Sequence, residues 1–319
     1  MSSNEIVDTR EDLTLESKPL HVMKFGGTSV GGVKPIERCA SLIQRYHRSA
    51  DLVVVASAMR GVTDNLVNLC NLYETGDKEL FDLGLEDMLY RHIQVVHELE
   101  LPRSLTESLE DELVDIFSKL YGNITLTSIM TPEKYARMVS TGERSSVRIL
   151  RSKLLAKGVL AEAIDASQLI ETDNNFKEAK PDFERTKRYV TNGLVPLIQN
   201  GIIPVVTGFI GATKDGKVTT LGRGGSDYTA SILGLVLKAD EVWIWTDVDG
   251  IYSADPRYNP DAELFREVSQ YRANMMAKMG ARVLYTKTIE PLLGTSTVLR
   301  VKNTFNPDAE GTKIIPNLS

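Results

Sequence analysis

The apolar residues of the chain gather in short runs, and segments with helical periodicity lie around them. Four runs are rich in β-branched or aromatic residues and are bounded by turn or cap residues, which is typical of buried strands. These runs are His21–Phe25, Leu52–Ala56, Ile202–Thr207 and Glu241–Thr246. The helical patterns are Pro35–His47, Asp64–Tyr73, Glu143–Lys157, Phe183–Gln199 and Asp227–Leu237. Strands that alternate with helices of this length predict an α/β fold, in which helices cover both faces of a parallel sheet.

Three further segments complete this picture. Residues 76–135 are amphipathic and rich in Glu, Asp and Leu, so we interpret them as a helical insertion. The leader, residues 1–20, is polar and acidic, and we expect it to be disordered. Leu299–Phe305 predicts a last strand, after which about a dozen residues remain. We therefore expect a single domain over residues 21–319.

The composition is that of an ordinary globular protein, with 42% hydrophobic and 25% charged residues. No apolar run approaches the roughly 20 residues needed to span a bilayer, and the leader does not resemble a secretory signal, so we expect a cytoplasmic protein and no membrane partner. Cys39 and Cys70 fit neither a disulfide framework nor a zinc pattern. The net charge of −6 argues against a nucleic-acid partner.

The first motif with chemical content is KFGGTSVGG, from Lys24 to Gly32. It places a lysine at the end of a strand, before a glycine-rich turn that leads into a helix. Glycines let backbone N–H groups approach a phosphate closely, and the lysine adds a full positive charge, so the motif suits a triphosphate. It matches neither the dinucleotide fingerprint nor the P-loop. The alternative is a turn of purely structural use.

A second glycine-rich turn, TLGRGGSD, runs from Thr220 to Asp227 and also opens a helical pattern. Arg223 can hold a carboxylate through a bidentate fork, and the glycines leave room for a ligand against the backbone. The alternative for Ser226 or Asp227 is a plain helix N-cap. The carboxyl ends of parallel strands line the ligand crevice of an open sheet, so the two turns can converge there.

A third motif, WTDVDGIY, runs from Trp245 to Tyr252 and is followed by Asp255-Pro256-Arg257. A strand that ends in polar residues and a turn is a suitable rim for a nucleotide. Its hydroxyl and carboxylate groups can bind ribose or base, Tyr252 can pack on adenine, and Arg257 can reach phosphate. A calcium loop is the weaker alternative, because the helix pair and closing glutamate of an EF-hand are missing.

These motifs together resemble the aspartokinase branch of the amino acid kinase family over about Val22 to Thr312. The resemblance is carried by KFGGTSV, STGE (Ser140–Glu143), TGFIG (Thr207–Gly211), LGRGGSD, TDVDGIY and RVKNTFNP (Arg300–Pro307). It implies a three-layer αβα sandwich with a mostly parallel eight-stranded sheet. The implied activity is phosphorylation of the L-aspartate side-chain carboxylate by ATP to 4-phospho-L-aspartate, the first step towards lysine, threonine, methionine or related metabolites.

The resemblance also implies roles for individual residues. Lys24 would contact the transferring phosphate, and Asp227 would orient Lys24. Substrate-binding residues are expected at Ser57, Thr63, Glu143, Phe209, Arg223 and Ser226. ATP-binding residues are expected at Lys24, Gly26, Gly27, Thr246, Asp247, Tyr252, Arg257 and Arg282. The plainer alternatives are a helix cap for Ser57 and Thr63, and a first-turn charge that complements the helix dipole for Glu143.

Two departures from the family pattern stand out. The family segment that resembles GAKVLHP reads GARVLYT here, from Gly280 to Thr286, so Arg282 replaces a nucleotide-contacting lysine and brings a planar fork with a different reach. Aspartokinases typically continue into ACT domains that bind feedback amino acids, whereas this sequence stops after Ser319. We therefore expect a catalytic domain without ACT domains and little inhibition by lysine or threonine.

The expected ligands are L-aspartate and MgATP, with Mg²⁺ bound mainly through the ATP phosphates and no dedicated protein metal site. We expect a homo-oligomer, with a homodimer as one form, and a separate regulatory chain is a further candidate partner. The rivals are a kinase of another small acid or of a nucleotide, such as a glutamate or uridylate kinase, and a catalytically silent binding protein. The GRGGSD segment argues against the first, and Lys24, Arg223 and Asp227 argue against the second.

Overall fold

The computed structural model describes residues 18–125, 129–259, 261–280 and 285–316. The strands are β1 (Leu20–Phe25), β2 (Asp51–Ala56), β3 (Ala161–Ile164), β4 (Glu171–Thr172), β5 (Ile203–Thr207), β6 (Ile210–Thr213), β7 (Val218–Thr220), β8 (Glu241–Thr246), β9 (Glu267–Ser269), β10 (Val298–Asn303) and β11 (Thr312–Ile315). The helices are α1 (Val33–His47), α2 (Val62–Thr75), α3 (Lys78–Glu98), α4 (Arg103–Thr125), α5 (Pro132–Val139), α6 (Thr141–Ala156), α7 (Phe183–Gln199), α8 (Gly225–Val236), α9 (Gln270–Lys278) and α10 (Thr286–Ile289). Short 3₁₀ turns lie at Ala166–Gln168 and Glu290–Leu292.

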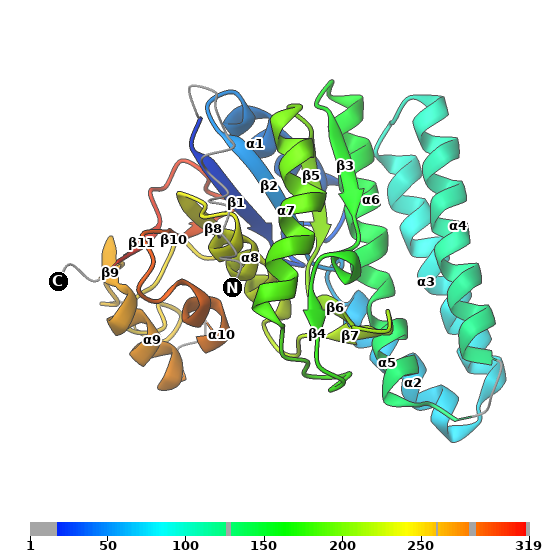
Figure 1. Ribbon diagram of the computed structural model, residues 1–319. Helices are drawn as coiled ribbons and strands as arrows, with labels where there is room; N and C mark the ends of the chain where they lie inside the picture. The colour runs from blue at the N-terminus through cyan, green and yellow to red at the C-terminus, as the bar shows by residue number, and fades with distance from the viewer. Residues whose placement is uncertain (1–17, 126–128, 260, 281–284, 317–319) are drawn as a thin grey trace, which may run out of the picture.

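The main sheet has eight strands in the order β3-β5-β2-β1-β8-β10-β11-β9 (Figure 1). All neighbouring pairs are parallel except β10 and β11. The predicted α/β fold with a mostly parallel eight-stranded sheet is therefore confirmed. A separate three-stranded sheet, β4-β6-β7, covers part of one end of the molecule.

The period-two pattern of the central strands divides the core between the two faces of the sheet. In β1, Met23 and Phe25 point to one hydrophobic cluster, and Leu20 and Val22 point to the other. All four side chains are buried, as expected for a strand that is covered on both faces. A shift of one residue in register would exchange the two faces, so this alternation fixes where Lys24 emerges at the strand end.

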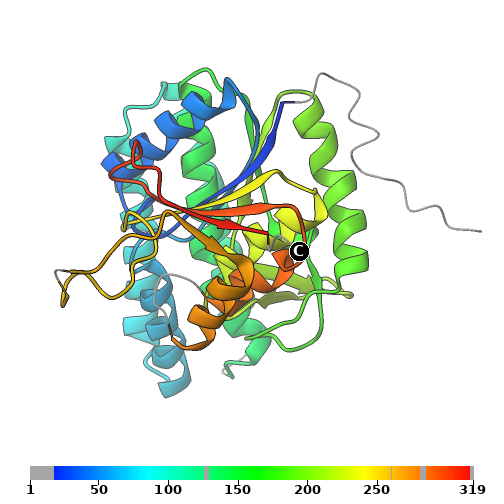
Figure 2. The ribbon, with the colours of Figure 1, turned by 90° about the vertical axis from the view of Figure 1, so that its left-hand side faces the viewer.

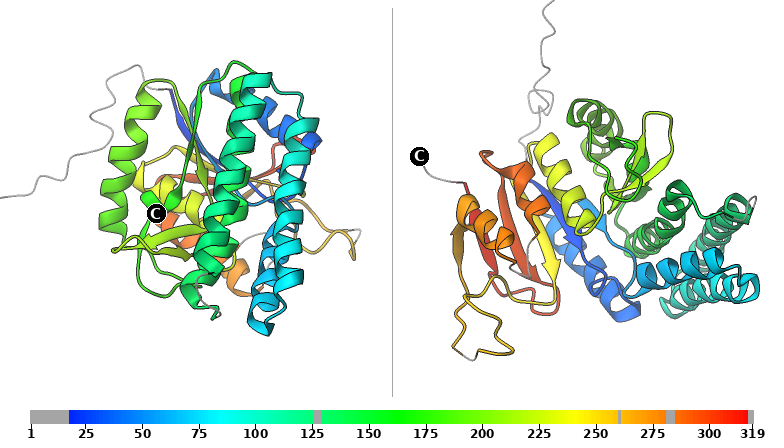
Figure 3. Two further views of the ribbon diagram at one scale, coloured as in Figure 1. Left: turned by 90° about the vertical axis from the view of Figure 1, so that its right-hand side faces the viewer. Right: turned by 90° about the horizontal axis from the view of Figure 1, so that it is seen from below.

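Helices cover both faces, which gives the three layers. On one face α1 and α6 pack against the central strands, and on the other α7 and α8 do so. Figure 2 shows α1 and α7 on opposite sides of the twisted sheet, and the view from below in Figure 3 shows α8, α9 and α10 together on the second side. None of the described helices combines the length and apolar character that a bilayer crossing requires.

The segment interpreted as an insertion contains two long helices. The helices α3 and α4 form an antiparallel pair that stands beside α6 at the edge of the molecule (Figure 3). Phe81 of α3 and Leu109 of α4 are fully buried and belong to the same hydrophobic cluster as Met23. The insertion therefore shares its core with the helical layer and packs as an extension of it.

One prediction about the strands is wrong. The predicted last strand at Leu299–Phe305 corresponds to β10, but β11 follows it and pairs with it in antiparallel orientation. The turn between them contains Gly311 at φ 75°, where an added Cβ would lie 2.0 Å from the Val301 carbonyl oxygen. Only glycine allows this close return of the chain, and β11 then pairs with β9 on its other side.

Candidate functional site

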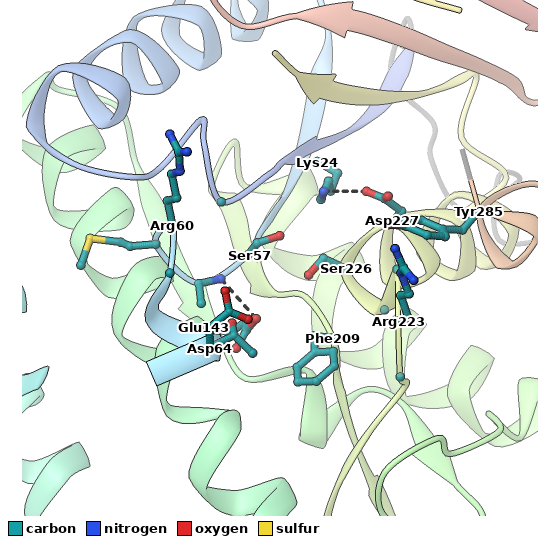
Figure 4. Close-up of a pocket in the computed structure, with 18 residues that line it drawn as sticks. Lys24, Ser57, Arg60, Asp64, Glu143, Phe209, Arg223, Ser226, Asp227 and Tyr285 are labelled. Carbon is teal, nitrogen blue, oxygen red and sulfur yellow. Dashed lines mark hydrogen bonds and ion pairs between the residues drawn. The ribbon is translucent and has the colours of Figure 1, made fainter. Parts of the chain in front are cut away.

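A cavity of about 350 Å³ lies at the carboxyl ends of β1 and β2, where α2, α6 and α8 begin. This is the edge at which open parallel sheets collect ligands. Nine of the residues predicted for the site line it: Lys24, Gly27, Ser57, Thr63, Glu143, Phe209, Arg223, Ser226 and Asp227. The sheet thus brings together side chains that are far apart in the sequence (Figure 4).

Lys24 and Asp227 form an ion pair inside this cavity. The Lys24 Nζ lies 2.6 Å from Asp227 Oδ1, and both side chains are almost completely buried. Lys24 comes from β1, and Asp227 comes from the first turn of α8. A buried charge pair of this kind loses much hydration, so it marks a place where charge is needed for function more than for stability.

The glycine-rich turn after β1 passes close to the Lys24 ammonium and to the loop after β2. A Cβ at Gly26 would lie 3.4 Å from the Lys24 ammonium, and one at Gly27 would lie 3.1 Å from the Ala58 carbonyl oxygen. The Gly26 N–H donates to the Trp245 carbonyl at the end of β8 (3.3 Å), which ties the turn to the third motif. The space beside the lysine is therefore open to a ligand.

The loop after β2 carries Ser57 and leads into α2. The first residue of this helix is preceded by Gly61 in the left-handed conformation (φ 78°), and no side chain caps the helix. Ser57 and Thr63 therefore do not act as helix caps, and both line the cavity. The uncapped N–H groups of the first turn of α2 carry partial positive charge next to them.

Glu143 lies in the first turn of α6 and is buried. Its Oε1 accepts a hydrogen bond from the Ala58 backbone N–H (3.2 Å), while its Oε2 has no partner within the described residues. Burial raises the pKa of the Glu143 carboxyl to about 8, against the opposing effects of that N–H and of Arg144 and Lys24. A buried carboxylate with a free oxygen in a cavity is suited to a positively charged group of a ligand.

The second glycine-rich turn shapes the opposite wall. Gly222 and Gly224 both have positive φ, 75° and 73°, and Arg223 between them projects into the cavity. Gly224 is the N-cap of α8, and no side chain makes a capping hydrogen bond there. The alternative that Ser226 or Asp227 is a plain N-cap is therefore wrong for this helix.

Phe209 reaches the cavity through an unusual backbone conformation. Its φ is 74°, which is costly for a large side chain and persists only when the surroundings determine it. Its backbone is fixed by two hydrogen bonds: the Phe209 N–H donates to Thr229 Oγ1 (3.1 Å), and the Phe209 carbonyl accepts from the Leu221 N–H (2.8 Å). The ring is thereby held against Gly225, where a Cβ would lie 2.8 Å from Phe209 Cδ2.

The other predicted nucleotide residues that the structure describes do not line this cavity. Thr246 ends β8 and donates to Asp247 Oδ1 (3.2 Å), close to the sheet edge that carries Gly26. Tyr252 pairs by an isolated bridge with Leu264, and the exposed Arg257 forms a two-bond ion pair with Asp255. Gly26 does not line the cavity either. Arg282, the last of the predicted ATP-binding residues, lies outside the described residues.

The calcium alternative also finds no support in the third motif. Asp249 Oδ1 accepts hydrogen bonds from the side-chain amides of Asn303 (2.8 Å) and Asn306 (3.2 Å), so this carboxylate joins β8 to the end of β10. Within residues 18–316, apart from the short gaps, no group of three or more acidic, histidine or cysteine side chains is arranged to hold a metal ion.

Three lining residues with charged or aromatic side chains were not predicted: Arg60, Asp64 and Tyr285. Arg60 and Asp64 flank Thr63 in the segment after β2, so their closeness to Ser57 in sequence was an available signal. Tyr285 follows Arg282 by three positions in the segment that departs from the family pattern.

The charges in the cavity are divided between its two walls. Arg223 lies on one side with Tyr285, whereas the two carboxylates, Glu143 and Asp64, lie on the other side together with Arg60 (Figure 4). The Lys24–Asp227 pair lies along the wall formed by β1 and α8. Such an arrangement can bind a small molecule with a carboxylate at one end and an ammonium at the other, and it leaves a lysine to meet a further anion.

The sequence matches the model of the amino acid kinase family over residues 19–303. It is 34% identical to the aspartokinase of Chlamydia trachomatis over 96% of this chain and 67% of that protein. It is also 34% identical to lysine-sensitive aspartokinase 3 of Escherichia coli over 92% of this chain and 63% of that protein. The chain spans only 54% of a Rickettsia prowazekii aspartokinase that is 32% identical to it.

Solved structures agree with these sequence matches. E. coli aspartokinase III in complex with aspartate and ADP superposes with a TM-score of 0.83 at 32% identity, over 94% of this chain and 65% of that one. The aspartate kinase of Clostridium acetobutylicum gives a TM-score of 0.75 at 26% identity, over 93% of this chain and 63% of that one. The similarity therefore covers nearly all of this chain and about two thirds of these relatives.

Proposed function

The chain belongs to the amino acid kinase family, in its aspartokinase branch, and on that premise we propose that it transfers the γ-phosphoryl group of ATP to the side-chain carboxylate of L-aspartate. The products are 4-phospho-L-aspartate and ADP. The observation that carries this proposal is the buried Lys24–Asp227 pair, which shares one cavity with Arg223 and Glu143. A related enzyme, E. coli aspartokinase III, binds aspartate and ADP.

The two walls of the cavity complement aspartate. Arg223 can bind a substrate carboxylate through two parallel hydrogen bonds, and the unpaired Oε2 of Glu143 can accept from the substrate ammonium. Ser57, Thr63 and Ser226 supply hydroxyl groups, and Phe209 supplies an apolar surface. The side-chain carboxylate of aspartate would then extend towards Lys24.

The nucleotide would approach from the edge formed by β1 and β8. Gly26 and Gly27 leave the backbone open beside the Lys24 ammonium, which fits phosphate oxygens. Thr246, Asp247, Tyr252 and Arg257 lie on the segment that continues from β8, and we propose that they hold the nucleoside and the distal phosphates. The exposed Asp255–Arg257 pair would open or turn for this, since exposed pairs of this kind are weak.

The chemical step requires positioning and neutralisation of charge. An oxygen of the aspartate side-chain carboxylate forms a bond to the γ-phosphorus, and the bond from that phosphorus to the β–γ bridging oxygen breaks, so ADP leaves with the electron pair. The nucleophile is already ionised, so no general base is needed. Lys24 stabilises the negative charge on the transferring group, and Asp227 fixes the ammonium in position.

Mg²⁺ fits this site through the nucleotide and not through a protein cage. The described lining residues offer a lysine and backbone N–H groups to the phosphates, and the Asp227 carboxylate is already engaged by Lys24. When bound to ATP, the ion neutralises phosphate charge and keeps several of its waters. We further propose that the product serves lysine, threonine or methionine formation. The chain should then restore the growth of an aspartokinase-deficient bacterium in medium that lacks these amino acids. Absence of growth, although the enzyme is expressed and active, would contradict this part of the proposal.

Purified protein should convert L-aspartate and MgATP into an acyl phosphate that hydroxylamine traps as a hydroxamate. ADP release should be measured in parallel over a panel that includes L-glutamate and uridine monophosphate. Turnover of glutamate or the nucleotide without aspartate would replace the substrate assignment. Nucleotide binding without turnover of any acceptor would favour the silent binding protein instead.

A further inference from the structure

The backbone that carries Arg223 is held rigidly from several directions. The Leu221 N–H donates to the Phe209 carbonyl (2.8 Å), and Lys287 Nζ donates to the Leu221 carbonyl (3.0 Å). A Cβ at Gly222 would lie 3.0 Å from Glu178 Cγ and 3.4 Å from Lys287 Nζ. The remaining freedom at this turn therefore belongs to the Arg223 side chain.

That side chain is exposed, and among the described residues no carboxylate pairs with it. The side chain instead contacts an aromatic ring: the Arg223 guanidinium carbon lies 5.5 Å from the centroid of the Tyr285 ring. The guanidinium plane stacks favourably on aromatic faces, so the ring restricts where the arginine points.

Tyr285 is itself well fixed. It is the N-cap residue of α10, and its carbonyl accepts from the Thr288 N–H (2.9 Å). The helix is attached to α8 because Ser231 Oγ donates to the Thr288 carbonyl (2.6 Å). The ring also packs on Gly224, where a Cβ would lie 2.7 Å from Tyr285 Cδ2, so even alanine at that position would displace it.

We propose that Tyr285 is a positioning residue, whose ring holds the Arg223 guanidinium in the orientation that binds a substrate carboxylate. The inference rests on the proposed function, in which Arg223 binds the α-carboxylate of aspartate. An unrestrained arginine loses rotamer freedom when it clamps a ligand, and a stacked arginine has already lost it. The ring therefore favours substrate binding, and it does so by restricting the Arg223 side chain.

The test compares Tyr285→Leu with Tyr285→Phe in the hydroxamate assay. The leucine variant keeps apolar volume but loses the π face, and we expect its KM for aspartate to rise about fivefold to tenfold, in line with a partly exposed cation–π contact. Its kcat and its KM for ATP should stay within about twofold of wild type. The phenylalanine variant keeps the face and should behave as wild type. Tyr90→Leu, at an exposed site on α3, is the matched control.

A double-mutant cycle separates positioning from a general structural role. If Tyr285 acts through Arg223, then Tyr285→Leu should change kcat/KM less than twofold in an Arg223→Ala background. An equal loss in both backgrounds, or a normal KM in a Tyr285→Leu protein whose thermal unfolding matches wild type, would overturn the inference alone. A wild-type protein that forms no aspartyl hydroxamate would overturn the proposed function and, with it, this inference.

Discussion

The Lys24 ammonium lies 2.6 Å from the Asp227 carboxylate, although Lys24 belongs to the first strand and Asp227 to the first turn of α8. The pair exists because β1 is central in the sheet and α8 packs directly over it. The burial of both side chains makes the pair sensitive to the loss of either partner, since the remaining charge would be buried alone.

Removal of either member of this pair should lower turnover. We expect Lys24→Met to reduce kcat by about 10²-fold to 10³-fold, because it removes a charge that meets the transferring phosphoryl group. Asp227→Asn should have a smaller effect in the same direction, and the double variant should be little worse than Lys24→Met, since the two residues act as a unit. Steady-state hydroxamate kinetics measure this, and Lys119→Met on the exposed face of α4 is the control. Additive losses in the double variant would contradict it.

Aspartate binding should release a proton near neutral pH. Burial raises the Glu143 pKa to about 8, so at pH 7 this carboxyl is mostly protonated in the free protein. A substrate ammonium favours the ionised form, so binding drives the proton off. Calorimetric titrations in buffers of different ionisation enthalpy should give about one proton released per aspartate at pH 7. In Glu143→Gln this release should vanish; unchanged release would show that another group is responsible.

The same carboxyl should affect stability. A pKa raised from 4.5 to about 8 means that between these values the folded protein keeps a proton that the unfolded chain has lost, so stability falls as pH rises. This group contributes a slope of about 1.4 kcal/mol per pH unit within that window. Denaturant unfolding at pH 5, 6 and 7 should therefore show that the free energy of unfolding of Glu143→Gln increases relative to that of wild type as pH rises. If the difference in free energy of unfolding between the two proteins is the same at all three pH values, the pKa of Glu143 is not raised.

The contact of α6 with the loop after β2 should tolerate no larger residue. An added Cβ at Gly142 would lie 2.7 Å from Ala58 Cβ and 2.9 Å from Val62 Cγ1. Gly142→Ala should destabilise the protein by about 1–3 kcal/mol through overpacking. It should also raise the KM for aspartate, because it displaces the Ala58 N–H that binds Glu143. Gly122→Ala in α4, where nothing lies within 4 Å, is the control and should be neutral or stabilising. Equal unfolding curves for the two variants would contradict the packing argument.

The long periodic elements were predictable from the sequence, and the short ones were not. The run Glu241–Thr246 matches β8, and Phe183–Gln199 matches α7, because a buried strand and an amphipathic helix each leave a clear pattern over several residues. The strands β4, β7 and β9 have two or three residues, too few to establish an alternation. The pairing of β4 and β9 also depends on partners that are distant in sequence, whereas β7 pairs with the preceding strand, β6.

The residues of the candidate site also fall into two groups, those that the sequence predicts and those that it does not. Lys24 and Arg223 were predictable because each sits beside glycines that a ligand turn requires. Tyr285 carries no such local signal: its role depends on α10 folding back onto α8, which the sequence pattern around it does not indicate. The alternative interpretation of Ser57, Thr63, Ser226 and Asp227 as helix caps is wrong for a related reason: the N-cap residues of α2 and α8 are Gly61 and Gly224, both in the left-handed conformation and without a side-chain cap.

His92 should make the protein less stable in mild acid. It lies in α3, fully buried against Phe117, and its Nδ1 is 2.6 Å from the Met88 carbonyl, which fits a neutral ring that donates from Nδ1. Its Nε2 has no partner among the described residues, so a second proton there would be buried without an acceptor. Burial accordingly lowers the pKa of His92 to about 4.

The direction of this pH dependence follows from proton binding to His92 in the folded and the unfolded protein. Between pH 6.5 and about 4 the unfolded chain binds a proton that the folded protein excludes, so stability falls as pH falls through this window and is unaffected by His92 above it. We expect the free energy of unfolding of His92→Leu to increase by about 2 kcal/mol relative to that of wild type when the pH is lowered from 7 to 5. Chemical denaturation at the two pH values measures the gain, with His97→Leu at the exposed end of α3 as the control. If the two histidine variants respond alike to pH, the acid sensitivity does not arise from the buried ring of His92.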